Sequence, residues 1–134
     1  MQKIEHIGIA VKSIEQYIKL YEVLLNTPCY KTEEVLSEGV KTAFYRVGPN
    51  KIELLEATNP DSPIAKFIAK KGEGIHHIAY AVTNIENEIT RLQNSGFELL
   101  NNVPKSGADN KKIIFLHPKS AGGVLVELCT DNDK

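Results

Sequence analysis

This chain of 134 residues has few cysteines and no long apolar segment. Cys29 and Cys129 are its two cysteines, and they lack the CxxC spacing of many redox and metal sites. Two cysteines without that spacing favour reduced thiols rather than a disulfide framework. No apolar run approaches the length of about 20 residues that a membrane-spanning helix needs.

The chain also lacks an excess of charge of either sign. It has 16 lysine and arginine residues against 17 aspartate and glutamate residues, which gives a net charge of −1. This balance argues against a nucleic-acid groove and against a polybasic membrane patch. Residues 1–6 already contain Lys3, Glu5 and His6, so we expect no signal peptide to begin there. We therefore expect a cytoplasmic protein with no nucleic-acid or membrane partner.

What the chain does contain is an internal repeat. The ten residues from His6 to Glu15 match the ten from His77 to Glu86 at six positions, and the second copy lies 71 residues after the first. A second match follows in the same order, because Ile52-Glu53-Leu54 resembles Val126-Glu127-Leu128, 74 residues later. Repeats of 20–50 residues indicate solenoids, whereas two copies of about 70 residues favour paired modules with one core.

Each half has the same expected order of elements, β-α-β-β-β. The expected strands cover residues 4–11, 30–36, 41–47 and 51–57 in the first half, and 75–82, 97–103, 112–116 and 123–129 in the second. The expected helices begin after Ser13, where Gln16 completes a capping box, and after Asn84, with a stop at Gly96; a short helix between the halves runs from Ser62-Pro63 to Gly72.

The sequence thus predicts an α+β fold built from two βαβββ modules. Module 1 covers about residues 1–72 and module 2 about residues 73–134, and the two together form a single domain. Length supports this, because a chain of this size buries roughly two-thirds of its unfolded surface and needs no disulfide to form a core.

The alternation of side chains along a strand separates the polar residues from the helix-packing ones. In the first strand, Ile7, Ile9 and Val11 form the face that packs on the helix. His6 lies on the other face with Gly8 and Ala10. His77 shares its face with two alanines in the corresponding strand, and Glu53 and Glu127 fall on the faces opposite the helices. Both histidines and both glutamates are therefore expected on faces that small side chains leave open.

Two imidazoles and two carboxylates in a sheet concavity need partners, because burial without them is unfavourable. A histidine at the start of a strand is more often structural or solvated, and a strand glutamate more often faces solvent. The repetition of the pattern in both halves instead favours a metal site. A set of two histidines and two glutamates suits a divalent ion, and six-coordination would leave two positions for a chelating substrate.

Other candidate residues are weaker. His76 is expected on the helix side, in the core or at its rim, and His117 in a loop. Cys129 shares its face with Glu127, but a small buried side chain is its expected role. The sequence has no phosphate-binding glycine loop and no serine-nucleophile motif.

The sequence resembles the vicinal oxygen chelate (glyoxalase/dioxygenase) superfamily, and within it the methylmalonyl-CoA epimerase family. The resemblance covers nearly the whole chain. The matching stretches are HIGIAV at 6–11, KIELL at 51–55, DSPIAKF at 61–67, GIHHIA at 74–79, FLHPK at 115–119 and GVLVEL at 123–128.

This resemblance implies paired βαβββ units with curved mixed sheets around a metal-binding cavity, and a homodimer. It implies metal ligands at His6, Glu53, His77 and Glu127, with Co2+ as the expected ion and Mn2+, Ni2+ or Zn2+ as alternatives. Some relatives have glutamine at the position of Glu53, so the charge here adds to the negative charge around the ion. The implied substrate is an acyl-CoA.

The implied reaction inverts the carbon between a thioester and a carboxylate through an enolate. Glu127 is the expected proton-transfer residue, although a carboxylate bound to a metal is a weak base unless it loosens. Some relatives have a glutamate three residues after the glycine that matches Gly39, where this chain has Thr42. The second acid or base could be Glu38, Glu53 or a bound water molecule, and the sequence does not decide between them.

Three alternatives remain open from the sequence. A glyoxalase I-like lactoylglutathione lyase, or another metal-dependent member of the superfamily, would use the same four ligands on a different substrate. An extradiol dioxygenase would use two histidines and one carboxylate around iron. A non-catalytic binding module would bind no metal and would not need all four ligands, so the presence of all four argues against this alternative.

Overall fold

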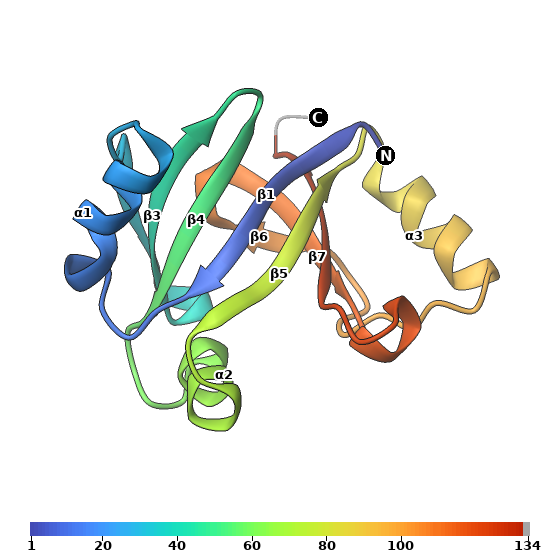
Figure 1. Ribbon diagram of the computed structural model, residues 1–134. Coiled ribbons are helices and arrows are strands. Elements are labelled where there is room, and N and C mark those ends of the chain that lie inside the picture. The colour runs from blue at the N-terminus through green and yellow to red at the C-terminus, as the bar shows by residue number, and fades with distance from the viewer. Residues whose placement is uncertain (133–134) are drawn as a thin grey trace. The chain divides into compact units, whose positions relative to one another are not determined.

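The computed structural model describes residues 1–132, which divide into two compact units (Figure 1). The N-terminal unit is His6–His76, and the C-terminal unit combines Met1–Glu5 with the residues from His77 onward. The chain therefore passes from one unit to the other twice, directly before His6 and directly before His77. Each unit is described by itself below.

The N-terminal unit has the expected order of one strand, one helix and three strands, followed by a second helix. Its elements are β1 (Lys3–Ala10, which starts in the other unit), α1 (Ile14–Leu25), β2 (Lys31–Val35), β3 (Val40–Val47), β4 (Asn50–Ala57) and α2 (Pro63–Lys71). The strand order is β2-β3-β4-β1. β1 runs parallel to β4, whereas β3 is antiparallel to both β2 and β4.

The C-terminal unit repeats this arrangement. Its elements are β5 (Gly74–Ala81, which starts in the other unit), α3 (Ile85–Asn94), β6 (Lys105–Gly107), β7 (Lys111–Leu116) and β8 (Val126–Asp131). The strand order is β5-β8-β7-β6, with β5 parallel to β8 and the remaining pairs antiparallel. The expected α+β class, with βαβββ order and mixed pairing in each half, is confirmed.

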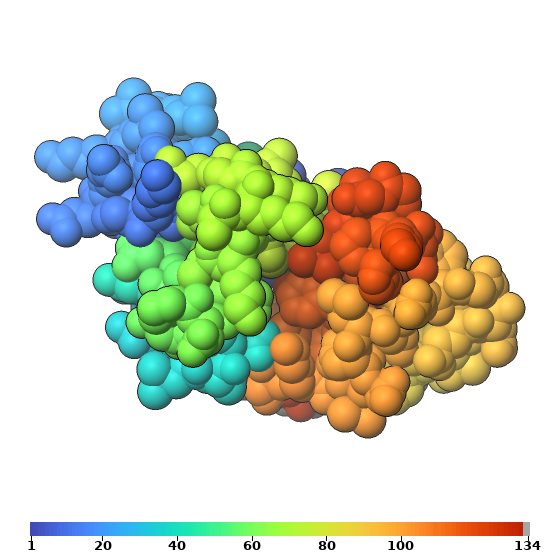
Figure 2. Space-filling view, turned by 90° about the horizontal axis from the view of Figure 1, so that it is seen from below, coloured from blue at the N-terminus to red at the C-terminus, as the bar shows by residue number. Residues whose placement is uncertain are grey.

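Each helix covers one face of its own strands, as the alternation predicts. The core beneath α1 includes Val11, Tyr45 and Leu54, and the core beneath α3 includes Ile114 and Leu128. On the opposite face of the N-terminal unit, Ile64 of α2 packs against residues of β1, β3 and β4. The exposed apolar residues of α1, which protrudes in blue in Figure 2, are Leu20, Val23 and Leu24.

Two local expectations are wrong. Residues 97–103 form no strand, and only an isolated bridge joins Leu99 to Leu116. The run Asn101-Asn102-Val103-Pro104 explains this, because asparagine and proline favour turns over a strand ladder. Ser13 precedes α1 as expected but makes no capping hydrogen bond, and Glu56 Oε1 accepts a hydrogen bond from Ile14 N at 2.7 Å.

The caps of the other two helices are as predicted. Ser62 Oγ accepts a hydrogen bond from Ile64 N at 3.1 Å at the start of α2, and Asn84 Oδ1 accepts from Asn87 N at 3.0 Å at the start of α3. Among residues 1–132, the helices are too short or too polar to cross a membrane. Both cysteines are free thiols.

Candidate metal and active site

In the N-terminal unit, His6 and Glu53 form a buried pair. His6 Nδ1 lies 3.2 Å from Glu53 Oε2, and the two side chains are 6% and 5% exposed. The β1–β4 register places Gly8, and not His6, directly beside Glu53. The Glu53 carboxylate therefore contacts a histidine two residues before its strand partner. That partner, Gly8, has no side chain that would block the contact.

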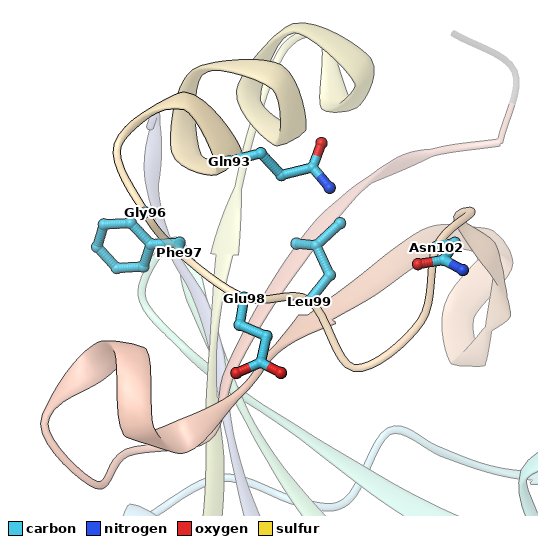
Figure 3. Close-up of a pocket in the computed structure, with 6 residues that line it drawn as sticks. All are labelled: Gln93, Gly96, Phe97, Glu98, Leu99 and Asn102. Atoms are coloured by element: carbon cyan, nitrogen blue, oxygen red, sulfur yellow. The ribbon is translucent and has the colours of Figure 1, made fainter.

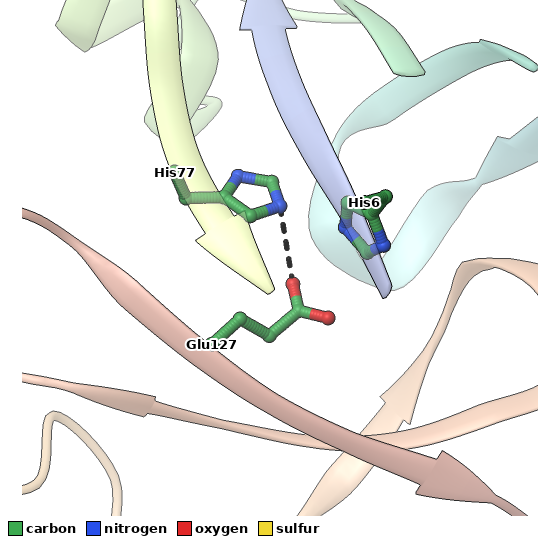
Figure 4. Close-up of side chains that lie close together, drawn as sticks. All are labelled: His6, His77 and Glu127. Atoms are coloured by element: carbon green, nitrogen blue, oxygen red, sulfur yellow. Dashed lines mark ion pairs between the residues drawn. The ribbon is translucent and has the colours of Figure 1, made fainter. Parts of the chain in front are cut away.

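The C-terminal unit contains an equivalent pair. His77 Nε2 lies 3.3 Å from Glu127 Oε1, and both side chains are 6% exposed (Figure 4). The β5–β8 register places Ala79 beside Glu127, so a small residue is again the strand partner of the glutamate. The two pairs thus occupy the same positions in the two copies of the repeat.

An aromatic ring lies opposite each glutamate in the neighbouring antiparallel strand. Phe44 of β3 pairs with Glu53, and Phe115 of β7 pairs with Glu127. The ring of His77 meets Phe115 edge to face, with 5.8 Å between the ring centroids. Each pair therefore has a polar partner and an apolar wall. The sequence alone did not reveal these two rings, because their pairing depends on strand register.

These side chains have the chemistry of metal ligands. Imidazole nitrogens and carboxylate oxygens bind borderline divalent ions, and their burial excludes competing water. His6, Glu53, His77 and Glu127 are all among the described residues that offer a ligand atom for a metal ion. Glu5, which is 5% exposed and precedes His6, is a further candidate that the sequence analysis missed.

The remaining candidates have structural roles. The ring of half-buried His76 contacts Phe67 of α2 edge to face at 5.0 Å. His117 Nδ1 accepts a hydrogen bond from Lys119 N and caps a short 3-10 turn. The buried Cys129 thiol donates to Tyr80 O at 3.7 Å. All three residues thus have the structural roles that the sequence predicts, and none is a predicted metal ligand.

A surface hollow of about 490 Å³ lies elsewhere in the C-terminal unit, between the end of α3 and the loop that follows it (Figure 3). Its lining residues are Gln93, Gly96, Phe97, Glu98, Leu99 and Asn102. None of the predicted ligands lines it, and it offers one carboxylate and no histidine. This hollow is therefore separate from the candidate metal ligands.

The model of the Glyoxalase/Bleomycin resistance protein/Dioxygenase superfamily matches residues 5–115 of this chain. The chain belongs to this superfamily. Its superfamily relatives include the uncharacterized protein YqjC of Bacillus subtilis, which is 40% identical over 96% of this chain and 92% of its own length. The human mitochondrial methylmalonyl-CoA epimerase is 39% identical over 94% of this chain and 72% of its own length.

A solved structure from the superfamily matches the fold over the same extent. It is a variant of the Streptomyces coelicolor methylmalonyl-CoA epimerase in complex with 2-nitronate-propionyl-CoA. The match covers 98% of this chain and 95% of that one, with a TM-score of 0.93 and 33% sequence identity.

Proposed function

We propose that this protein is an enzyme that interconverts the (2R) and (2S) epimers of methylmalonyl-CoA. The observation that carries this proposal is the pair of buried histidine–glutamate contacts, repeated at equivalent positions of the two units. The identity to the human epimerase and the fold match to the Streptomyces coelicolor epimerase support the substrate class. A substrate with a carboxylate and a thioester on one carbon suits such a site, because both groups offer oxygen atoms to a metal.

The proposed metal site consists of His6, Glu53, His77 and Glu127. Two neutral imidazoles and two carboxylates balance the charge of one divalent ion, and we propose Co2+ as that ion. The repeat supports this ligand set, because each unit contributes one buried histidine–glutamate pair at the equivalent positions.

The chemistry follows from the acidity of the substrate. A bound divalent ion would act as a Lewis acid that stabilises the negative charge left when the α-proton is removed. We assign the proton transfer to the Glu127 carboxylate, which is held beside His77 in a buried environment. Glu53, Glu38 or a water molecule would exchange a proton on the opposite face of the substrate.

Several properties of the assembly belong to the same proposal. We propose that the two units form a single domain, that the protein is a cytoplasmic homodimer, and that its substrate is an acyl-CoA. The exposed apolar residues of α1 are compatible with self-association. Light scattering of the purified protein would measure twice the mass of 14.9 kDa if the dimer forms, and that mass itself if it does not.

The test is the incorporation of deuterium at C2 of methylmalonyl-CoA in D2O, followed by NMR with cobalt-loaded protein. Wild type should exchange the α-proton, and Glu127→Gln should slow the exchange by about 10²- to 10⁴-fold while it still binds cobalt. Glu98→Gln, in the surface hollow, is the matched control and should exchange at the wild-type rate.

Absence of exchange in wild type would overturn the proposed function. Undiminished exchange in Glu127→Gln would instead overturn only the role of Glu127. A parallel assay with the hemithioacetal of glutathione tests the glyoxalase I alternative, and we expect no turnover of that substrate.

A further inference from the structure

Thr42 has a buried hydroxyl group with no hydrogen-bond partner. The residue lies in β3 and is 0% exposed, and within residues 1–132 no donor or acceptor reaches its Oγ1. A buried hydroxyl without a partner is unfavourable, and native structures contain few of them. An unpaired group of this kind therefore requires an explanation.

The register places Thr42 on the face that holds Glu53. Thr42 pairs with Leu55, while Phe44 pairs with Glu53, so all four side chains share one face of the sheet. Diagonal neighbours on such a ladder have Cβ atoms about 7–8 Å apart. Thr42 and Glu53 are diagonal neighbours of this kind, so a molecule held at Glu53 would lie on the same face of the sheet as the Thr42 hydroxyl.

The fold itself does not need a hydroxyl here. In the C-terminal unit, Phe115 pairs with Glu127 and Ile113 pairs with Cys129, so Ile113 is the structural equivalent of Thr42. Ile113 is 5% exposed and packs with Ala79 and Cys129. One copy of the repeat thus fills this position with an apolar side chain, and the other places a hydroxyl there, beside apolar Leu55.

We propose that Thr42 Oγ1 donates a hydrogen bond to the carboxylate of the bound substrate. This inference rests on the proposed function. A carboxylate is the strongest acceptor that the substrate offers to a hydroxyl in apolar surroundings. Because the carboxylate keeps its charge throughout the reaction, the hydrogen bond stabilises the bound substrate and the transition state alike, and it acts on KM more than on kcat.

The decisive variant is Thr42→Val, which keeps the shape of the side chain and removes the hydroxyl. We expect KM for methylmalonyl-CoA to rise about tenfold or more, with kcat within about threefold of wild type. The melting temperature should stay the same or rise, since an unpaired hydroxyl is replaced by a methyl group. Thr42→Ser, which restores the hydroxyl, should return KM to within about threefold of wild type.

Ile113→Val is the matched control at the equivalent position of the other unit, and its KM should equal that of wild type. An unchanged KM in Thr42→Val, with active wild type, would overturn the proposal for Thr42 and leave the proposed function standing. A lower melting temperature with unchanged KM would show that the hydroxyl binds a structural water, which also overturns it. Inactive wild type would instead refute the proposed function.

Discussion

The Glu53 carboxylate contacts His6, although the strand register places Gly8 at its side. A small residue at position 8 leaves room for this contact at 3.2 Å. The C-terminal unit has the same relationship, in which Glu127 contacts His77 and lies beside Ala79. Space beside each glutamate is thus as much a part of the site as the ligands.

A larger residue at position 8 should weaken metal binding. Gly8→Val places a branched side chain on the face shared with His6 and beside Glu53, so the carboxylate can no longer pass over it. We expect the affinity for Co2+, measured by calorimetry, to fall on the order of tenfold. Ile7→Val, on the opposite face of β1, is the control, and equal affinities in the two variants would contradict this view of the site.

The helix caps give a prediction about stability. Ser62→Ala should lower the free energy of unfolding by about 1 kcal/mol, because Ile64 N loses its acceptor at the buried start of α2. Ser13→Ala should change it by less than about 0.5 kcal/mol, since Ser13 makes no capping hydrogen bond. Urea denaturation of both variants measures the difference, and a larger loss in Ser13→Ala would refute the assignment of the caps.

The Glu73 carboxylate predicts a pH dependence of stability. It accepts hydrogen bonds from Lys12 N and from the Tyr17 hydroxyl, both at 2.7 Å, and the bond from Lys12 N is the main cause that lowers its pKa below the ordinary value of 4.5. The folded state therefore favours the ionised form. Its contribution to stability is complete above the pKa of the unfolded chain and is lost as the pH falls through the lower pKa of the folded state.

Glu73→Gln tests this dependence by urea denaturation at several pH values. Wild type should be more stable than the variant near pH 7, and the difference should shrink as the pH falls below about 4. Glu15→Gln, on the exposed surface of α1, is a control for the removal of one surface carboxylate. A difference between wild type and Glu73→Gln that stays constant with pH would contradict the role of the carboxylate.

The sequence was sufficient to predict the parts of the structure that repeat. Nearly equal spacing, 71 and 74 residues, selected His6 with His77 and Glu53 with Glu127, and the alternation of side chains assigned them to the faces opposite the helices. The caps at Ser62 and Asn84 were also predictable, because their hydrogen bonds join residues two or three apart in the chain. Local and periodic signals therefore determined the class of fold and the candidate ligands.

Features that depend on distant residues could not be predicted. Glu56 supplies the acceptor for the first turn of α1 from 42 residues away, so the Ser13 signal gave the right helix start with the wrong cap. The equivalence of Thr42 and Ile113 depends on the register of two strand pairs, which the sequence does not specify. Strand propensity in residues 97–103 was overridden by the turn-forming asparagines and proline.

The most direct test of the shared metal site is the stoichiometry of Co2+ binding, measured by calorimetry on wild type and on the four variants His6→Ala, Glu53→Ala, His77→Ala and Glu127→Ala. One ion should bind to each chain of wild type, and every variant should bind it at least about tenfold more weakly, whichever unit carries the substitution. Two ions per chain, or full affinity after substitution of either pair, would contradict a single ion held by both.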